Sequence, residues 1–99
     1  MTEYKISYIH DPVNKEILAK NEAGEVAGEI NYAGNHPFWT ITHTGVRPEY
    51  RGGDTARTLV RLVVEAARDA GVHLDATCSY ALKVLERTQE YHDVYNPGD

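Results

Sequence analysis

The chain has few of the features that mark secreted, membrane-bound or nucleic-acid-binding proteins. Its single cysteine, Cys78, excludes an intrachain disulfide and favours a reducing compartment. No apolar run reaches the length of a membrane span, and the N-terminus lacks the basic and apolar regions of a signal peptide. Acidic residues outnumber basic ones by 15 to 10, which argues against nucleic acid as a partner. We therefore expect a cytoplasmic protein with neither a membrane nor a nucleic-acid partner.

The composition is that of one ordinary globular domain. The chain has 99 residues, of which 41% are hydrophobic and 25% charged. This length supports one modest hydrophobic core and is too short for two, so residues 1–99 are expected to form a single domain. The five histidines and the cysteine show no spacing typical of metal ligands, and no metal is predicted.

The first half of the sequence has the pattern of β-strands. Apolar and polar residues roughly alternate over residues 4–9, 15–19, 25–32 and 38–46, and turn-forming residues separate these runs. In the last run the alternation places Trp39, Ile41 and His43 on one face, with Thr44 and Val46 on the other. Four strands in an antiparallel meander are the simplest arrangement.

After Gly52 the apolar residues recur with the period of a helix. One stripe contains Ala56, Leu59, Val60, Val63, Val64 and Ala67. Gly71 is a suitable residue to end this helix, residues 72–78 alternate as a short strand, and Ser79 is expected to cap a second helix. The predicted fold is therefore α+β, in the order β-β-β-β-α-β-α, with the last two strands parallel and residues 96–99 a frayed tail.

The chemistry is expected in residues 43–56, where a strand end passes through a turn rich in Pro, Gly and Arg into a helix. The first N–H groups of a helix have no partner within it, and they carry a partial positive charge. Such a helix start is a ready site for an anion, and a phosphate is the expected ligand.

Three short segments resemble the GNAT superfamily of acyl-CoA-dependent N-acyltransferases, most closely its minimal one-domain members. They are Thr42-His43-Thr44 with Val46 and Pro48, then Tyr50-Arg51-Gly52 before the helix, then Cys78-Ser79-Tyr80 at the last helix; Glu90-Tyr91 is similar to the family's ending. The resemblance spans about Lys15 to Tyr91. It implies an N-acetyltransferase that uses acetyl-CoA as co-substrate, releases coenzyme A, and acetylates an amine of a small molecule or protein.

The family's pyrophosphate signature, [Gln/Arg]-x-x-Gly-x-[Gly/Ala], aligns with Arg51-Gly52-Gly53-Asp54-Thr55-Ala56. Arg51 and Ala56 match it, but Asp54 replaces the middle glycine, which would let backbone N–H groups close on a diphosphate. Asp54 is also a favoured helix cap, and its carboxylate would compete for the same N–H groups. Gly53 could supply the flexibility one residue earlier. The resemblance implies that these six residues hold coenzyme A, and Asp54 predicts weaker binding than the family pattern.

Three side chains are candidates for catalysis, each with a plain structural alternative. His43 is either a general base for the amine or a polar strand residue paired with a neighbour. Cys78 is either a buried apolar residue or a thiolate that accepts the acetyl group at a helix N-terminus. Tyr80 is either the acid that protonates the departing thiolate or an aromatic residue at the core edge. The family resemblance also implies that a backbone N–H near Val46 stabilises the oxyanion.

We expect direct acetyl transfer to a primary amine, whose identity the sequence does not give. Two other classes of protein remain open. One is a module that binds coenzyme A or acyl-CoA with little turnover, which Asp54 favours. The other is a small interaction protein that keeps the fold without the ligand. A measurable rate of acetyl transfer would identify an enzyme and reject the binding module. A failure to bind coenzyme A would identify the interaction protein.

Overall fold

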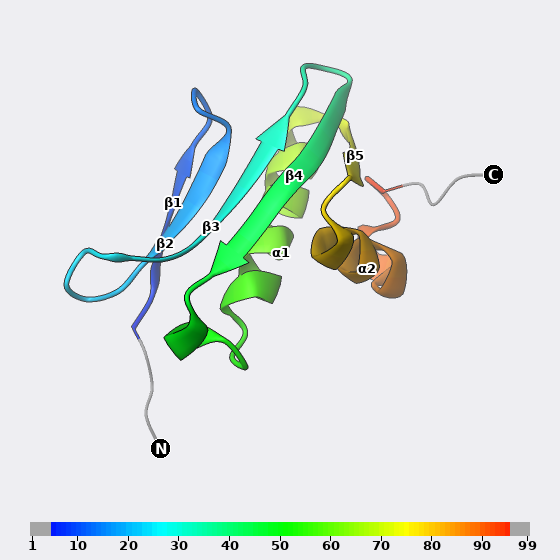
Figure 1. Ribbon diagram of the computed structural model, residues 1–99. Coiled ribbons are helices and arrows are strands. Elements are labelled where there is room, and N and C mark those ends of the chain that lie inside the picture. Colours follow the sequence, from blue (N-terminus) through cyan, green and yellow to red (C-terminus); the bar gives the residue numbers. More distant parts are fainter. Residues whose placement is uncertain (1–4, 96–99) are drawn as a thin grey trace.

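The computed structural model describes residues 5–95. Five strands form one sheet in the order β1-β2-β3-β4-β5, the first four antiparallel and the last pair parallel, as predicted (Figure 1). The elements are β1 (Ser7–Asp11), β2 (Glu16–Lys20), β3 (Val26–Ala33), β4 (Phe38–Val46), η1 (Pro48–Tyr50), α1 (Thr55–Ala70), β5 (His73–Ala76), α2 (Ser79–Arg87) and η2 (Gln89–Tyr91). The predicted element order is therefore confirmed. The predicted start of the first strand at residue 4 and the predicted tail at residues 96–99 lie outside the described residues.

β1 runs two residues further than predicted, because Asp11 belongs to the strand rather than to the turn. Asp11 pairs with Glu16, and its Oδ1 accepts the N–H groups of Val13 and Asn14 at 3.1 Å each. A carboxylate that bonds the backbone two and three residues ahead stabilises a tight turn. The same residue therefore ends the strand and holds the turn into β2.

The alternation predicted along β4 is wrong beyond Ile41. Tyr32 of β3 pairs with Ile41, whereas the residue before Tyr32 pairs with His43, so β4 contains one extra residue here. Such a β-bulge reverses the face on which later side chains lie. Thr44 and Val46 therefore share the helix-covered face with Ile41, and Val46 packs against the core. His43 is exposed on the opposite face.

α1 covers one face of the sheet with the predicted apolar stripe. Leu59, Val60, Val63, Val64 and Ala67 are completely buried. Each fully buried Val or Leu side chain stabilises the fold by roughly 1.5–3 kcal/mol, so this stripe anchors the helix. Gly71 ends α1 in the left-handed conformation with φ of 69°, as predicted for a C-terminal stop.

β5 pairs with β4 only as far as Ile41 and Ala76. The next two N–H groups, of Thr77 and Cys78, both point to the carbonyl oxygen of Ile41, at 3.0 and 3.3 Å. The chain then turns away into α2, while β4 continues to Val46 (Figure 1). Cys78, with extended φ and ψ of −69° and 121°, is the N-cap of α2, and the prediction that Ser79 caps this helix is wrong.

The segment after α2 returns to the sheet and to α1. Val94 and Tyr95 are 5% exposed, and the carbonyl of Val94 accepts the N–H of Leu74 at 2.9 Å. Asp93 receives two hydrogen bonds from the guanidinium of Arg68, at 2.5 and 2.8 Å. These contacts fix the last described turn against α1 and β5. Within residues 5–95, neither helix combines the length and the apolar character needed to cross a membrane.

Candidate functional site

The candidate site begins at the edge of β4 that β5 leaves open. Arg47 donates its N–H to the carbonyl of Ala27 on β3, at 2.8 Å. Backbone polar groups of successive strand residues point to alternate sides, so those of Val46 face the open edge. The carbonyl of Val46 accepts a hydrogen bond there from Nε of Arg51, at 3.2 Å. The last residues of β4 therefore offer backbone groups to a ligand that enters between the two strands.

A cavity of about 370 Å³ lies beside this edge, and we call it the wedge cavity. Its lining combines the end of β4, the loop before α1 and the first turn of α2: Thr44, Gly45, Val46, Tyr50, Arg51, Gly52, Gly53, Ala56 and Tyr80. The structure thus brings together six residues that the sequence nominated from distant segments: Val46, Arg51, Gly52, Gly53, Ala56 and Tyr80. Backbone groups, two phenols and one guanidinium form a lining suited to a long ligand with an anionic end.

The loop into α1 takes its shape from Gly52. Its φ is 90°, a value that residues with a side chain rarely adopt. Gly53 has no such requirement, and a methyl group there would meet only the carbonyl oxygen of Tyr50 at 3.7 Å. The flexibility that the sequence assigned to Gly53 is therefore used one residue earlier.

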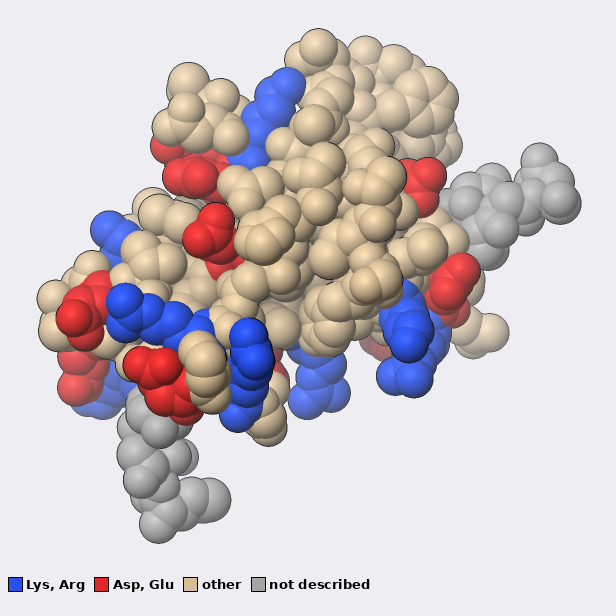
Figure 2. All heavy atoms as spheres, in the orientation of Figure 1, with Lys and Arg blue, Asp and Glu red and all other residues tan. Residues whose placement is uncertain are grey.

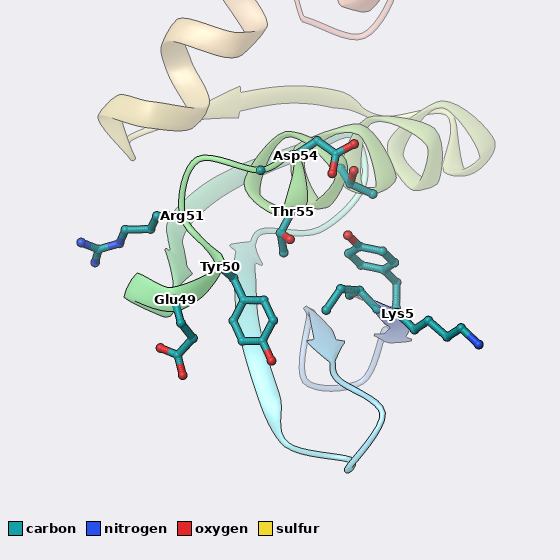
Figure 3. A pocket seen from close by; sticks show the side chains of 10 residues that line it. Lys5, Glu49, Tyr50, Arg51, Asp54 and Thr55 are labelled. Atoms are coloured by element: carbon teal, nitrogen blue, oxygen red, sulfur yellow. The ribbon is translucent and has the colours of Figure 1, made fainter. Parts of the chain in front are cut away.

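A second cavity, of about 540 Å³, lies on the other side of the same loop, towards β1 (Figure 3). We call it the β1-side cavity. Asp54 and Thr55 line this cavity, and neither lines the wedge cavity. Figure 3 shows the carboxylate of Asp54 on the side of the loop opposite to the guanidinium of Arg51. Of the other signature residues, Gly52 and Ala56 line only the wedge cavity, whereas Arg51 and Gly53 line both cavities.

Asp54 is the N-cap of α1, as the sequence indicated, but it makes no side-chain capping hydrogen bond. Its φ and ψ are −106° and 14°, whereas a capping residue normally has an extended backbone that aims its side chain at the first N–H groups. The predicted competition between this carboxylate and an anion for those N–H groups is therefore not present. Asp54 contributes a nearby negative charge instead.

Cys78 lies half-buried where β4 and β5 part. Its Sγ is 3.7 Å from Oγ1 of Thr44, which accepts the S–H. Burial raises the pKa of the Cys78 thiol, but the backbone N–H of Ala81, the hydroxyl of Thr44 and the N–H groups of Tyr80 and Thr44 together outweigh burial and lower this pKa. Neither helical N–H has the geometry of a full capping hydrogen bond. The thiol thus loses its proton more readily than an ordinary cysteine does, as expected at a helix N-terminus.

Tyr80 follows in the first turn of α2, with 37% of its surface exposed. Burial raises the pKa of its phenol, Arg57 lowers it, and the neighbouring Cys78 raises it, with a net rise above 10.0. The phenol therefore keeps its proton at neutral pH and can donate it. Because Tyr80 lines the wedge cavity, that proton is available to a group bound there.

His43 is not part of the wedge cavity lining. The bulge in β4 places it on the helix-free face of the sheet, where its imidazole covers Gly45. A methyl group on Gly45 would lie 3.0 Å from Nε2 of His43, so a larger residue would displace the ring. The structure therefore places His43 and the Cys78–Tyr80 pair on opposite faces at the same end of β4.

The charge around the wedge cavity differs from that of the whole chain. The net charge is −5, yet Arg51 lines the cavity and Arg57 acts on the phenol of Tyr80, while Arg47 at the end of β4 is paired with Glu49 at 4.0 Å. Figure 2 shows basic side chains along the lower edge of the molecule, mixed with acidic ones, while the middle of the sheet face carries few charges. An anionic ligand would thus meet positive charge at the loop.

Sequence reasoning missed the part played by Thr44 and Gly45. Thr44 contacts Cys78 through its hydroxyl, and Gly45 makes room for the ring of His43. The contact of Thr44 with Cys78 depends on the bulge in β4, of which the sequence gives no signal. His43 and Gly45 share a face because they are two residues apart in one strand.

Comparison with known proteins gives a consistent result. A family model described as GCN5-related N-acetyl-transferase matches residues 16–94. None of the curated proteins matches the chain significantly. The solution structure of a GCN5-like protein from Staphylococcus aureus is 28% identical, with a TM-score of 0.73, over 100% of this chain and 94% of the other.

Two further solved structures share the fold at lower identity. Ribosomal-protein-alanine N-acetyltransferase from Brucella melitensis biovar Abortus 2308 is 13% identical, with a TM-score of 0.64, over 86% of this chain and 90% of the other. A protein from Deinococcus radiodurans R1 is 23% identical, with a TM-score of 0.61, over 73% of this chain and 51% of the other. The chain thus spans nearly all of some relatives and about half of others.

Proposed function

Because the chain belongs to the family of GCN5-related N-acetyltransferases, we propose that it transfers the acetyl group of acetyl-CoA to a primary amine. The observation that carries this proposal is the parting of β4 and β5 after Ile41 and Ala76, with Cys78 and Tyr80 at the point of separation. The acceptor is an amine of a small molecule or of a protein. A cytoplasmic location and a single domain over residues 1–99 are part of the same proposal.

In this proposal acetyl-CoA enters the wedge cavity along the open edge of β4. Arg51 and the backbone around Gly52 and Gly53 hold the pyrophosphate, and the first N–H groups of α1, which the side chain of Asp54 does not cap, add positive potential. The acetyl thioester end of acetyl-CoA reaches the end of β4 near Val46. The absence of a capping bond from Asp54 supports this placement, because the carboxylate does not occupy those N–H groups.

The reaction proceeds by direct attack of the neutral amine on the acetyl carbonyl carbon. The backbone N–H of Val46, which faces the open edge, stabilises the oxyanion that forms. The carbon–sulfur bond then breaks, and the coenzyme A thiolate takes a proton from Tyr80 or Cys78. The proton of the attacking nitrogen leaves to His43 or to water on the helix-free side.

Cys78 allows a second route within the same site. Its thiolate would attack the acetyl carbonyl, release coenzyme A and pass the acetyl group to the amine in a second step. The lowered pKa of this thiol favours this route, whereas the raised pKa of Tyr80 keeps the phenol protonated, as an acid in direct transfer must be before it reacts. The two routes differ in whether an acetylated protein forms before the amine is added.

The test combines intact-protein mass spectrometry with chromatographic detection of free coenzyme A. The protein is incubated with acetyl-CoA alone, and then with spermidine, a lysine ester or a peptide with a free N-terminus. Direct transfer predicts coenzyme A release only with an amine, and Tyr80→Phe should lower kcat by roughly 10²-fold or more if this phenol is the acid. The covalent route predicts an acetyl adduct that Cys78→Ala abolishes.

Two outcomes would contradict the proposal. Coenzyme A binding without acetyl transfer to any amine would favour a binding module, which the charge of Asp54 near the loop supports. No binding of coenzyme A at all would favour an interaction protein that has kept the fold.

A further inference from the structure

Thr44 and Cys78 meet across the gap between β4 and α2. The sulfur and the hydroxyl oxygen are 3.7 Å apart, a distance at which sulfur takes part in hydrogen bonds, and both residues are half-buried. Thr44 also lines the wedge cavity together with Tyr80. We propose that Thr44 is a positioning residue that holds the sulfur of Cys78 at the cavity in both of its protonation states. This inference rests on the proposed function of the site.

A threonine hydroxyl suits this role because it both donates and accepts hydrogen bonds. The neutral thiol of Cys78 donates its S–H to Oγ1 of Thr44. When the thiol loses its proton to solvent, the hydroxyl of Thr44 rotates and donates its own proton to the sulfur. The backbone N–H of Thr44 also lowers the pKa of this thiol, so two groups of one strand residue act on the sulfur.

The bulge in β4 is what makes this contact possible. Without the extra residue after Ile41, the side chain of Thr44 would lie on the helix-free face and His43 would face Cys78. The structure therefore uses a shift of one residue to put a hydroxyl on the thiol side. Valine replaces the hydroxyl of threonine by a methyl group of similar size, so it removes the hydrogen bond with little change of shape.

The experiment is the pH dependence of alkylation by iodoacetamide. Cys78 is the only cysteine of the chain, so the reaction reports on this thiol alone. The variants are Thr44→Val, Thr44→Ser, which keeps the hydroxyl, and Thr42→Val. The last is a matched control, because the hydroxyl of Thr42 bonds the backbone carbonyl of Asn31 at 3.4 Å.

We expect Thr44→Val to move the alkylation midpoint to higher pH and to slow the reaction at neutral pH by about 3- to 10-fold, the effect of losing one ordinary hydrogen bond. Thr44→Ser and Thr42→Val should behave like the wild type. Wild-type rate and midpoint in a Thr44→Val protein that keeps its thermal midpoint would overturn the inference. Should that variant fail to fold, Thr44→Ala removes the same hydroxyl without adding a methyl group, and the same criteria apply.

This experiment is independent of acetyl transfer, because it needs neither acetyl-CoA nor an amine. A shifted midpoint in a protein that acetylates nothing would support the role of Thr44 and refute the proposed function. An unshifted midpoint in an active enzyme would do the reverse.

Discussion

Gly52 and its neighbour Gly53 allow the loop of the candidate site to be tested with one chemical change at two positions. Gly52 has φ of 90°, where a residue with a side chain costs roughly 1–2 kcal/mol. A methyl group at Gly52 would meet no atom within 4 Å, and one at Gly53 would make only an ordinary contact. The two Gly→Ala variants therefore differ in backbone strain and not in packing.

Either substitution also restricts the unfolded chain, which stabilises the protein by about 0.4–1 kcal/mol when the native backbone is compatible. This gain is common to both variants and cancels in their difference. Gly52→Ala should therefore be less stable than Gly53→Ala by about 1–2 kcal/mol. For a domain of this size the corresponding difference in Tm is roughly 4–16 °C.

Urea denaturation gives the two free energies of unfolding, and a calorimetric titration with coenzyme A gives the two affinities. Gly52→Ala should bind coenzyme A less tightly than Gly53→Ala, since it changes the loop that holds the pyrophosphate. Gly52→Asn should recover part of the lost stability, because asparagine tolerates positive φ. Equal stability of the two alanine variants would mean that the backbone at Gly52 relaxes without cost and that its positive φ is not required.

Three further predictions concern charged side chains. Arg51→Ala should weaken coenzyme A binding by about 1–3 kcal/mol through loss of a charge-assisted contact, whereas Arg47→Ala should change this affinity little. Pantetheine, which lacks the pyrophosphate, should bind both variants equally well. Equal losses of coenzyme A affinity in both variants would point to unspecific attraction. Asp54→Asn should tighten binding by at most about 0.5 kcal/mol, with an effect that added salt removes; a large gain would restore the competition that the backbone angles argue against. The hydrogen bond and charge of Arg68 lower the pKa of Asp93 below 3.8, so the Asp93 carboxylate stabilises the fold above that pH. The difference in Tm between wild type and Asp93→Asn should therefore disappear as the pH falls through the lowered pKa. A constant difference in Tm across this range would contradict the ion pair of Arg68 with Asp93.

The helical half of the chain was readable from sequence because its signals are local. The stripe from Ala56 to Ala67 repeats over several turns, and Gly71 follows it directly. Neither depends on a partner element, and the structure confirms both. The meander and its parallel last strand were readable for a similar reason, since short turns and a helical crossover leave few alternatives.

The face of the sheet on which each later β4 side chain lies could not be predicted from the sequence, because register is a property of two paired strands. Nothing in Thr42-His43-Thr44-Gly45 is strongly apolar, so a shift of one residue leaves no mark in the pattern. The extra residue is visible only in the pairing of β3 with β4. This single feature moved His43 away from the thiol side and brought Thr44 to Cys78.

The ends of the two helices failed for a different reason. Asp54 and Ser79 are residue types that favour caps, but preference for a position does not fix the backbone angles there. Asp54 has a ψ of 14°, which directs its carboxylate away from the first N–H groups, and Ser79 lies one residue inside α2 because Cys78 has the extended backbone. Side-chain direction at a cap follows the loop, which the local sequence did not determine.

Binding of acetyl-CoA in the wedge cavity can be observed residue by residue through amide chemical shifts recorded during titration with acetyl-CoA. We expect the largest shifts at Val46, Gly52, Gly53, Ala56 and Tyr80, which line that cavity together. Shifts confined to residues that line only the β1-side cavity, such as Tyr8 and Thr58, would contradict binding in the wedge cavity, as would a spectrum that acetyl-CoA leaves unchanged.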